Sequence, residues 1–289
     1  MNSRRKLTSP RTIGVHLRLQ TSYSDLAKEA LSLGLDSFQL FLMPQNKKNY
    51  LKITTKEAAE FKELCKALTS VYVHSSYWIN LATGKKESAE IAERLLKKEL
   101  TIAEKLGITN LVLHPGSAKS HPKTTDDPTG KKAGISSLAT ILNKICAQHP
   151  NMTILLENTA HESSSIGSDF NDFIELKKLF TNPEQIKFCL DFAHAYAYGY
   201  DVTQTASFIK MIKKTIGIDS IKLIHLNDST ECLGSKKDHH EIPGKGLIGT
   251  EALKALVTSS ELKNIPVVLE LPPMENSEIK SIIDEVKNW

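Results

Sequence analysis

The sequence predicts a single α/β domain built as a (β/α)8 TIM barrel, and three observations lead to this prediction. Eight short apolar runs alternate with eight segments of helical periodicity along the 289 residues. The runs are apolar on both faces, as buried parallel strands are. The chain is also close to the length of roughly 250 residues that is typical of such a barrel.

Each predicted strand is followed by one predicted helix. The strands cover residues 12–16, 37–41, 71–74, 111–114, 154–157, 188–191, 223–225 and 267–270. The helices cover residues 26–33, 55–68, 87–106, 132–148, 169–180, 203–216, 250–258 and 276–288. Gly34 and Gly107 stand where helix C-caps are expected, and Thr55 is a suitable N-cap.

We expect one domain, with residues 1–11 as a flexible N-terminus and residues 12–289 as the barrel. Pro, Gly and Ser residues form no cluster that is typical of a linker. The longest predicted loops, 115–131, 158–168 and 227–249, all follow strands. In a barrel these loops carry substrate recognition.

The composition limits the partners and the compartment. The formal charge is +4 and the sequence pI about 8.7, which is compatible with a polyanionic partner. The four cysteines are widely spaced, which argues against a disulfide framework and indicates a reduced, cytoplasmic protein. No apolar stretch resembles a signal peptide or a membrane span, so we expect no association with membranes.

Six successive strands end in a histidine or a carboxylate, at intervals of 40, 43, 34, 34 and 45 residues. The carboxyl ends of barrel strands meet at one mouth, so side chains distant in sequence become neighbours there. A single histidine at such a place often has only a structural role, whereas six acidic or histidine residues in succession predict a metal site. They are His74, His114, Glu157, Asp191, His225 and Glu270.

Three further candidate ligands follow strands. His194 lies three residues after Asp191, and Asp238 and His240 form a D-x-H pair whose side chains can point the same way. Nitrogen and carboxylate ligands without thiolates suit zinc, manganese or iron(II), and imidazole favours zinc. Nine ligands are too many for one ion. Three ions fit if a carboxylate such as Glu157 bridges two of them.

Such a site suits hydrolysis of a phosphodiester. Ions about 3.5–4 Å apart can stabilise both the attacking and the leaving oxygen and can turn bound water into hydroxide near neutral pH. Covalent serine catalysis is a poorer interpretation, because the sequence has no GxSxG motif. No Gly-rich phosphate-binding loop follows a predicted strand either.

At these residues the chain resembles the endonuclease IV family of apurinic/apyrimidinic endonucleases. The resemblance covers about residues 12 to 288. It rests on the segments HSSYWINL at 74–81, LHPGS at 113–117, LENTA at 156–160, CLDFAHA at 189–195 with GYD at 199–201, HLNDS at 225–229, GSKKDHH at 234–240, GKG at 244–246 and LE at 269–270.

The resemblance implies a DNA base-excision-repair enzyme that binds double-stranded DNA containing abasic sites. It would cut the phosphodiester 5′ to the abasic site by attack of a metal-bound hydroxide and leave a 3′-hydroxyl and a 5′-deoxyribose phosphate. Three zinc ions are implied, with manganese as an alternative at one site, and Glu157 would be the catalytic residue. The ligand sets would be His74, His114 and Glu157; Glu157, Asp191, His225 and Glu270; and His194, Asp238 and His240.

The resemblance also implies DNA-contacting residues. Tyr77 and Trp78 match the loop that enters the duplex beside the abasic site, where an aromatic wedge replaces lost stacking. Gln45 and Asn46 lie in a second DNA-contacting stretch, with Asn46 where an arginine is common. We expect a monomer without an obligate protein partner.

Two other classes of protein remain as alternatives. A sugar isomerase or epimerase of related barrel fold needs one divalent ion, for which Glu157, Asp191, His225 and Glu270 alone would suffice. It would not need the other five ligands. A DNA-binding module without catalytic activity would need none of the nine.

Overall fold

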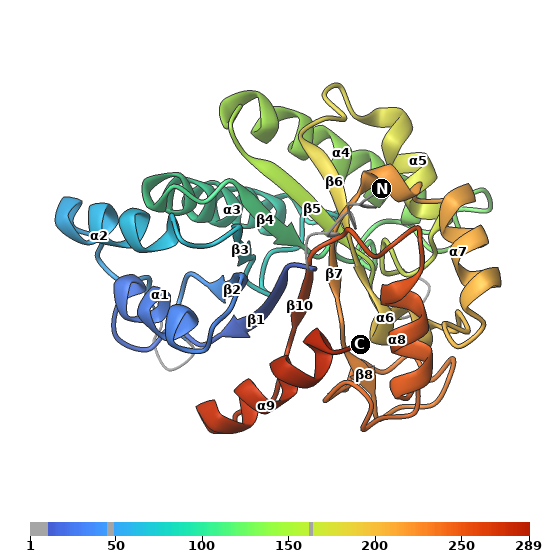
Figure 1. Cartoon of the computed structure of the whole chain (residues 1–289). Helices are drawn as coiled ribbons and strands as arrows, with labels where there is room; N and C mark the ends of the chain where they lie inside the picture. The colour runs from blue at the N-terminus through green and yellow to red at the C-terminus, as the bar shows by residue number, and fades with distance from the viewer. Residues whose placement is uncertain (1–10, 45–48, 162–163) are drawn as a thin grey trace, which may run out of the picture.

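Eight parallel strands close into a barrel in the computed structural model, which describes residues 11–44, 49–161 and 164–289 (Figure 1). The predicted fold class is therefore confirmed. The strand order is β1-β10-β7-β6-β5-β4-β3-β2, and the blue β1 pairs with the red β10 to close the barrel. The strands are β1 Ile13–Leu17, β2 Ser37–Phe41, β3 Ser70–His74, β4 Asn110–Leu113, β5 Thr153–Glu157, β6 Ile186–Asp191, β7 Ile221–His225 and β10 Val267–Leu269.

Helices surround the barrel in the expected order (Figure 1). They are α1 Tyr23–Ser32, α2 Thr55–Cys65, α3 Lys86–Leu106, α4 Lys131–Gln148, α5 Asn171–Leu179, α7 Thr205–Lys214, α8 Thr250–Thr258 and α9 Asn276–Lys287. Helix α3 ends at Gly107, whose φ of 75° is left-handed, as a glycine C-cap requires. Thr54, one residue before the predicted cap, accepts a hydrogen bond from the backbone N–H of Glu57 and caps α2.

The structure adds elements that the sequence pattern did not predict. Helix α6, Phe192–Tyr198, follows β6 without a loop, and Asp191 is its N-cap. A 3-10 turn, Ile218–Ser220, precedes β7. Within the loop 227–249, β8 (Asp228–Ser229) pairs antiparallel with β9 (His240–Glu241). The predicted flexible segment 1–11 lies outside the described residues except for Arg11, so the domain boundary stays a prediction.

The core has two layers. A large outer layer fills the space between the helices and the outer faces of the strands. A smaller inner cluster fills the barrel and takes one residue from each of six strands: Tyr72, Val112, Leu155, Cys189, Leu223 and Val268. The barrel is thus a packed core that supports the side chains at its mouth.

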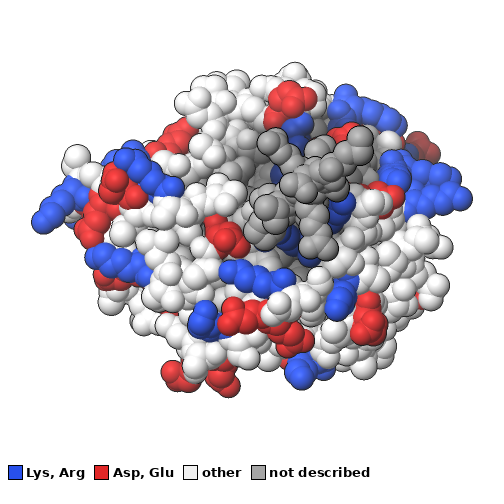
Figure 2. All heavy atoms as spheres, viewed as in Figure 1, with Lys and Arg blue, Asp and Glu red and all other residues white. Residues whose placement is uncertain are grey.

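Charges of both signs are intermingled on the face seen in Figure 2, where neither sign forms one continuous field. This agrees with the modest formal charge of +4. Across the residues that the structure describes, no helix combines the length and the apolar character needed to cross a membrane.

Candidate metal centre

The barrel strands bring the six predicted strand-end ligands to one mouth. Each of them lies two residues after a member of the inner cluster, as Glu157 lies after Leu155 and Asp191 after Cys189. Successive side chains of a strand alternate between its faces, so a spacing of two keeps the ligand on the barrel-lining face. The packed interior therefore forms the base on which the ligands stand.

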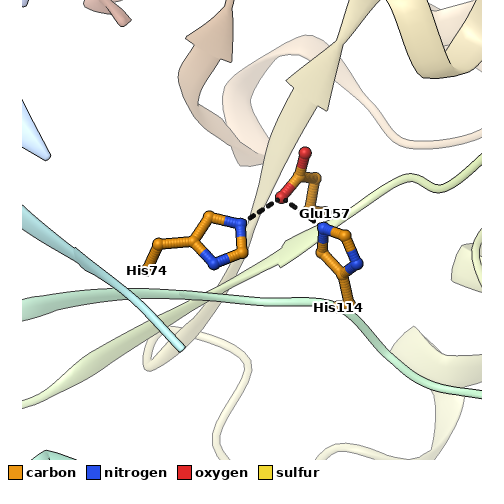
Figure 3. A group of neighbouring side chains, drawn as sticks. All are labelled: His74, His114 and Glu157. Carbon is orange, nitrogen blue, oxygen red and sulfur yellow. Dashed lines mark hydrogen bonds and ion pairs between the residues drawn. The ribbon is translucent and has the colours of Figure 1, made fainter. Parts of the chain in front are cut away.

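The first ligand group joins β3, the residue after β4, and the end of β5. Nε2 of His74 and Nε2 of His114 each lie 3.1 Å from the same carboxylate oxygen, Oε2 of Glu157. Figure 3 shows both imidazole rings directed at that oxygen. All three donor atoms lie within 4.8 Å of one another, which is close enough for one metal ion.

The second ligand group lies around His225 at the end of β7. Its Nδ1 lies 3.0 Å from Oε1 of Glu157, 3.5 Å from Oε2 of Glu270 and 3.7 Å from Oδ2 of Asp191. Glu157 therefore belongs to two groups, with one oxygen directed to each. A carboxylate shared in this way is the geometry that the bridging role predicted for Glu157 would require.

The third ligand group forms a triangle. Nε2 of His194 lies 3.2 Å from Oδ1 of Asp238, Nε2 of His240 lies 3.1 Å from the same oxygen, and the two nitrogens are 3.1 Å apart. Asp191 also lies within reach of both histidines and can serve the same ion. His239 points elsewhere and pairs with Glu231 at 2.7 Å, so the two side chains of the D-x-H pair do share a direction.

Hydrogen bonds outside the ligand groups fix the tautomers of two histidines. Nδ1–H of His74 donates to the carbonyl of Ser75 at 2.8 Å, and Nδ1–H of His194 donates to the carbonyl of Asn158 at 2.7 Å. In the neutral form of each ring, these bonds leave the Nε2 lone pair directed into the site. Such partners orient the histidine ligands of protein metal sites.

The donor set fits cations. In the third group, two imidazole nitrogens and a carboxylate oxygen converge within 3.2 Å of one another. Imidazole nitrogen and carboxylate oxygen are the ligand atoms that zinc takes in proteins, so the donor set fits a divalent ion. The side chains gathered here could therefore hold metal ions.

The charge of the cluster points the same way. Its four carboxylates pair only with histidines among the described residues, without a lysine or arginine ion pair. Burial disfavours the charge on Glu157, yet His225 and His114 hold its pKa well below the usual range. Against the effect of burial, Asp191 and Asp238 raise the pKa of His194 well above its usual value. Buried carboxylates of this kind are stabilised by nearby positive charge, which divalent ions can supply.

Amide side chains that the sequence reasoning missed orient these ligands. Oε1 of Gln39 accepts from Nε2–H of His225 at 3.0 Å, while its Nε2 donates to Oε1 of Glu270 at 2.8 Å. Asn227 donates to Asp191 at 2.7 Å and to Glu270 at 3.1 Å. The sequence contained a signal for Gln39. An amide within an apolar strand is buried when the chain folds, and a buried amide must have hydrogen-bond partners.

His16 and Gln39 complete the mouth of the barrel, since they are register partners on β1 and β2. Nδ1 of His16 lies 2.9 Å from Nε2 of Gln39 and 3.4 Å from Oε1 of Glu270. His16 therefore lies beside Glu270, one of the candidate ligands.

Asp228 organises the loop that carries Asp238 and His240. Its buried carboxylate accepts backbone N–H bonds at 2.9–3.1 Å from four residues of the returning chain: Gly244, Gly246, Ile248 and Gly249. Asp228, which the sequence showed only as part of the HLNDS motif, therefore holds together the loop that carries Asp238 and His240.

Tyr77 and Trp78 stand at the rim of the site with side chains 68% and 81% exposed. The ring of Tyr77 lies 5.6 Å from that of His74 and 5.8 Å from that of His114 between centroids, so Tyr77 borders the first ligand group and Trp78 is the next residue of the same exposed turn. The other two predicted DNA-contacting residues, Gln45 and Asn46, lie outside the described residues.

Comparisons with known proteins identify the family. Residues 27–289 match the family described as xylose isomerase-like TIM barrel. The chain is 34% identical over 285 residues to a probable endonuclease 4 of Thermosipho melanesiensis, covering 96% of this chain and 97% of the relative. It is 32% identical over 282 residues to the apurinic-apyrimidinic endonuclease 1 of Saccharomyces cerevisiae, covering 95% of this chain and 74% of the relative.

A solved structure agrees with these relatives. The crystal structure of endonuclease IV from Thermus thermophilus superposes with a TM-score of 0.82 at 27% identity, covering 97% of this chain and 98% of that one. The xylose isomerase-like description alone fits several barrel enzymes, whereas the curated relatives share nearly the whole length of this chain. The chain belongs to the endonuclease IV family.

Proposed function

We propose that this protein is a DNA-repair endonuclease that hydrolyses the phosphodiester 5′ to an abasic site, leaving a 3′-hydroxyl and a 5′-deoxyribose phosphate. One observation carries the proposal: three overlapping groups of metal ligands lie beside an exposed aromatic pair. The printed names of the relatives, endonuclease 4 and apurinic-apyrimidinic endonuclease, support it.

We assign three ions, one to each ligand group, and zinc is the metal that imidazole and carboxylate donors favour, with manganese as an alternative at one group. Bound divalent ions supply positive charge to the phosphate oxygens and lower the pKa of the attacking water. Glu157 is the catalytic residue of this proposal, because it lies between two groups and directs one oxygen to each. Its carboxylate accepts a hydrogen bond from the attacking water and orients it toward phosphorus.

The rim supplies recognition in this proposal. Tyr77 and Trp78 are the wedge that fills the gap beside the abasic sugar, where no base stacks. Extrusion of that sugar costs least where pairing and stacking are already lost, which gives selectivity for damage. Gln45 and Asn46 remain proposed DNA contacts, and the monomeric state and the cytoplasmic location remain predictions from the sequence.

The decisive experiment is cleavage of a labelled duplex that carries one tetrahydrofuran analogue of an abasic site. The zinc-loaded protein should make one cut, 5′ to the analogue, and a DNA polymerase should extend the new 3′-hydroxyl. Protein stripped of metal by a chelator should not cut until zinc is restored, and an intact duplex of the same sequence is the control. The absence of any cut by folded, zinc-loaded protein would contradict the proposal. Ketose substrates with manganese would then test the one-metal epimerase.

A further inference from the structure

Helix α3 contains a buried carboxylic acid that the proposed chemistry does not use. The side chain of Glu99 is 2% exposed and lies between Leu96 and Leu100, which are fully buried. Burial raises the pKa of Glu99 to about 7. In the described part of the chain no lysine, arginine or histidine forms an ion pair with it. An acid kept in such a place against the effect of burial requires another explanation.

Glu99 accepts hydrogen bonds from two separate segments of the molecule. The hydroxyl of Tyr50 donates to Oε1 at 2.9 Å, and the backbone N–H of Ser76 lies 3.3 Å from both carboxylate oxygens. The neighbouring Lys98 places its Nζ 4.5 Å from the centroid of the Tyr50 ring, a cation–π distance. Lys98 and Glu99 of α3 therefore both contact Tyr50. Glu99 also contacts the loop that begins at Ser75.

Ser76 is the residue immediately before the exposed pair Tyr77 and Trp78. The far side of the same turn is held by Asn80, whose Oδ1 accepts from the N–H of Ser117 at 3.0 Å and whose Nδ2 donates to the carbonyl of Ser117 at 3.0 Å. The turn also closes on itself, because the N–H of Ile79 donates to the carbonyl of Ser76 at 3.0 Å. Glu99 thus secures one end of the turn and Asn80 the other.

We propose that Glu99 is a positioning residue for damage recognition. By accepting hydrogen bonds from both Ser76 and Tyr50, it holds the aromatic turn at residues 77–78 and the side chain of Tyr50 in the arrangement that a distorted duplex requires. This inference rests on the proposed function, in which the aromatic pair enters the DNA. A turn fixed before binding loses less conformational entropy when DNA binds, so its rigidity increases affinity for the duplex that it fits.

The proposal concerns hydrogen-bond acceptance, and this determines the variants. Glu99→Leu has a similar size but leaves the N–H of Ser76 and the hydroxyl of Tyr50 without an acceptor. Glu99→Gln keeps one oxygen, and in the structure Oε1 serves both donors. Tyr50→Phe removes one of the two bonds and leaves the carboxylate in place. Glu93→Gln is the matched control, since Glu93 lies on the same helix and pairs with Lys97 and Lys144 instead.

The first measurement is the ratio of Kd for an intact duplex to Kd for an abasic-analogue duplex, together with kcat and KM. Glu99→Leu should lower the ratio about tenfold, the size expected from losing a buried hydrogen bond. The change should appear in KM and leave kcat nearly unchanged. Glu99→Gln should keep most of the wild-type ratio, and Tyr50→Phe should give a ratio between those of Glu99→Leu and the wild type. Glu93→Gln should give the wild-type ratio.

The second measurement needs no DNA. The chain has two tryptophans, Trp78 and Trp289, so Trp289→Phe leaves Trp78 as the single reporter on the turn. In that background Glu99→Leu should lower the fluorescence anisotropy of Trp78, and Glu99→Gln should not. A wild type that fails to cut the abasic duplex would remove the proposed function, while this measurement would still decide whether Glu99 orders the turn.

Two outcomes overturn the inference. One is an unchanged Kd ratio and unchanged Trp78 anisotropy in folded Glu99→Leu. The other is an equal loss of affinity for both duplexes, because a general loss of stability would produce it. If Glu99→Leu does not fold, Tyr50→Phe decides the question by the same two readouts.

Discussion

The floor and the rim of this site are built in opposite ways. On the floor, Glu157 and His225 are fully buried, and hydrogen bonds with neighbouring side chains fix the orientation of His225 and Asp191. On the rim, Trp78 is 81% exposed, and the turn that carries it is held mainly at its two ends, by Glu99 and Asn80. Strands fix the ligands, and loops present the surface that meets a partner. Changes to the floor should therefore affect catalysis, and changes to the rim should affect selection.

The largest effect is expected from Glu157→Gln on the floor. The variant keeps the shape of the side chain but removes the negative charge that two ligand groups share. Cleavage should fall by about three orders of magnitude or more, whereas binding to abasic duplex should remain, because the rim is untouched. Single-turnover cleavage and fluorescence binding assays would check this. Full activity in the metal-loaded variant would contradict the assignment of Glu157 to catalysis.

A smaller effect is expected from Gln39→Leu, which changes the floor without removing a ligand. His225 would lose the acceptor that fixes its tautomer, and Glu270 would lose a donor. Loss of such a partner typically weakens metal affinity about 10–100-fold. Competition with a chromophoric chelator would measure the affinity. If affinity and cleavage are both unchanged, the hydrogen bonds of Gln39 have no part in metal binding.

On the rim, Tyr77→Ala should act on selection instead of catalysis. The ring contacts His74 and His114 only from outside the ligand group, so the metal content should not change. Preference for abasic over intact duplex should fall about tenfold, the scale of one lost aromatic stacking contact. Parallel Kd measurements on both duplexes and metal analysis would test this. An unchanged preference would show that the wedge lies elsewhere.

The smallest effect on cleavage is expected from Glu99→Gln, which should instead change how stability depends on pH. The pKa of Glu99 is raised from 4.5 to about 7, so its charged form is disfavoured in the folded state. The resulting penalty is absent below about pH 4.5, grows as the pH rises to about 7 and is constant above that. Glu99→Gln should therefore exceed the wild type by about 3 kcal/mol in unfolding free energy above pH 7.

Urea unfolding at pH 4.5, 6 and 8 would measure this difference. Glu93→Gln should behave in the opposite sense, because hydrogen bonds from Lys144 and Lys97 hold the pKa of Glu93 below its usual value. A stability difference for Glu99→Gln that does not vary with pH would contradict the prediction.

The strands and the gathering of their terminal side chains were predictable because a barrel repeats one pattern. The same apolar run with a polar residue at its end recurs around the mouth, so Glu157 and Asp191 could be placed there without knowledge of their neighbours. Helix α6 was not predicted, because its seven residues follow β6 directly and no loop marks its start. Asp191 ends the strand, caps the helix and faces two ligand groups at once.

The supporting residues were harder to predict for a different reason. Gln39 and Glu99 are recognised only by the partners that the fold brings to them, and those partners lie far away in sequence. Glu99 looks like one more charged residue of a long helix until its place on the apolar face beside Leu96 and Leu100 is noticed. Periodicity identifies the face on which a residue lies, but not the backbone N–H that it meets there.

The sharing of carboxylates has a consequence for how the protein fills with metal. Glu157 belongs to the first and second ligand groups, and Asp191 lies within reach of the second and third, so no group is independent of the others. Occupancy of one group changes the charge and the orientation of an oxygen that its neighbour needs, and this coupling must be reciprocal. The three proposed zinc ions should therefore bind as a linked set, and a titration should depart from three identical, independent steps. At limiting zinc, activity would then follow the fraction of fully loaded molecules and not the average number of ions per molecule.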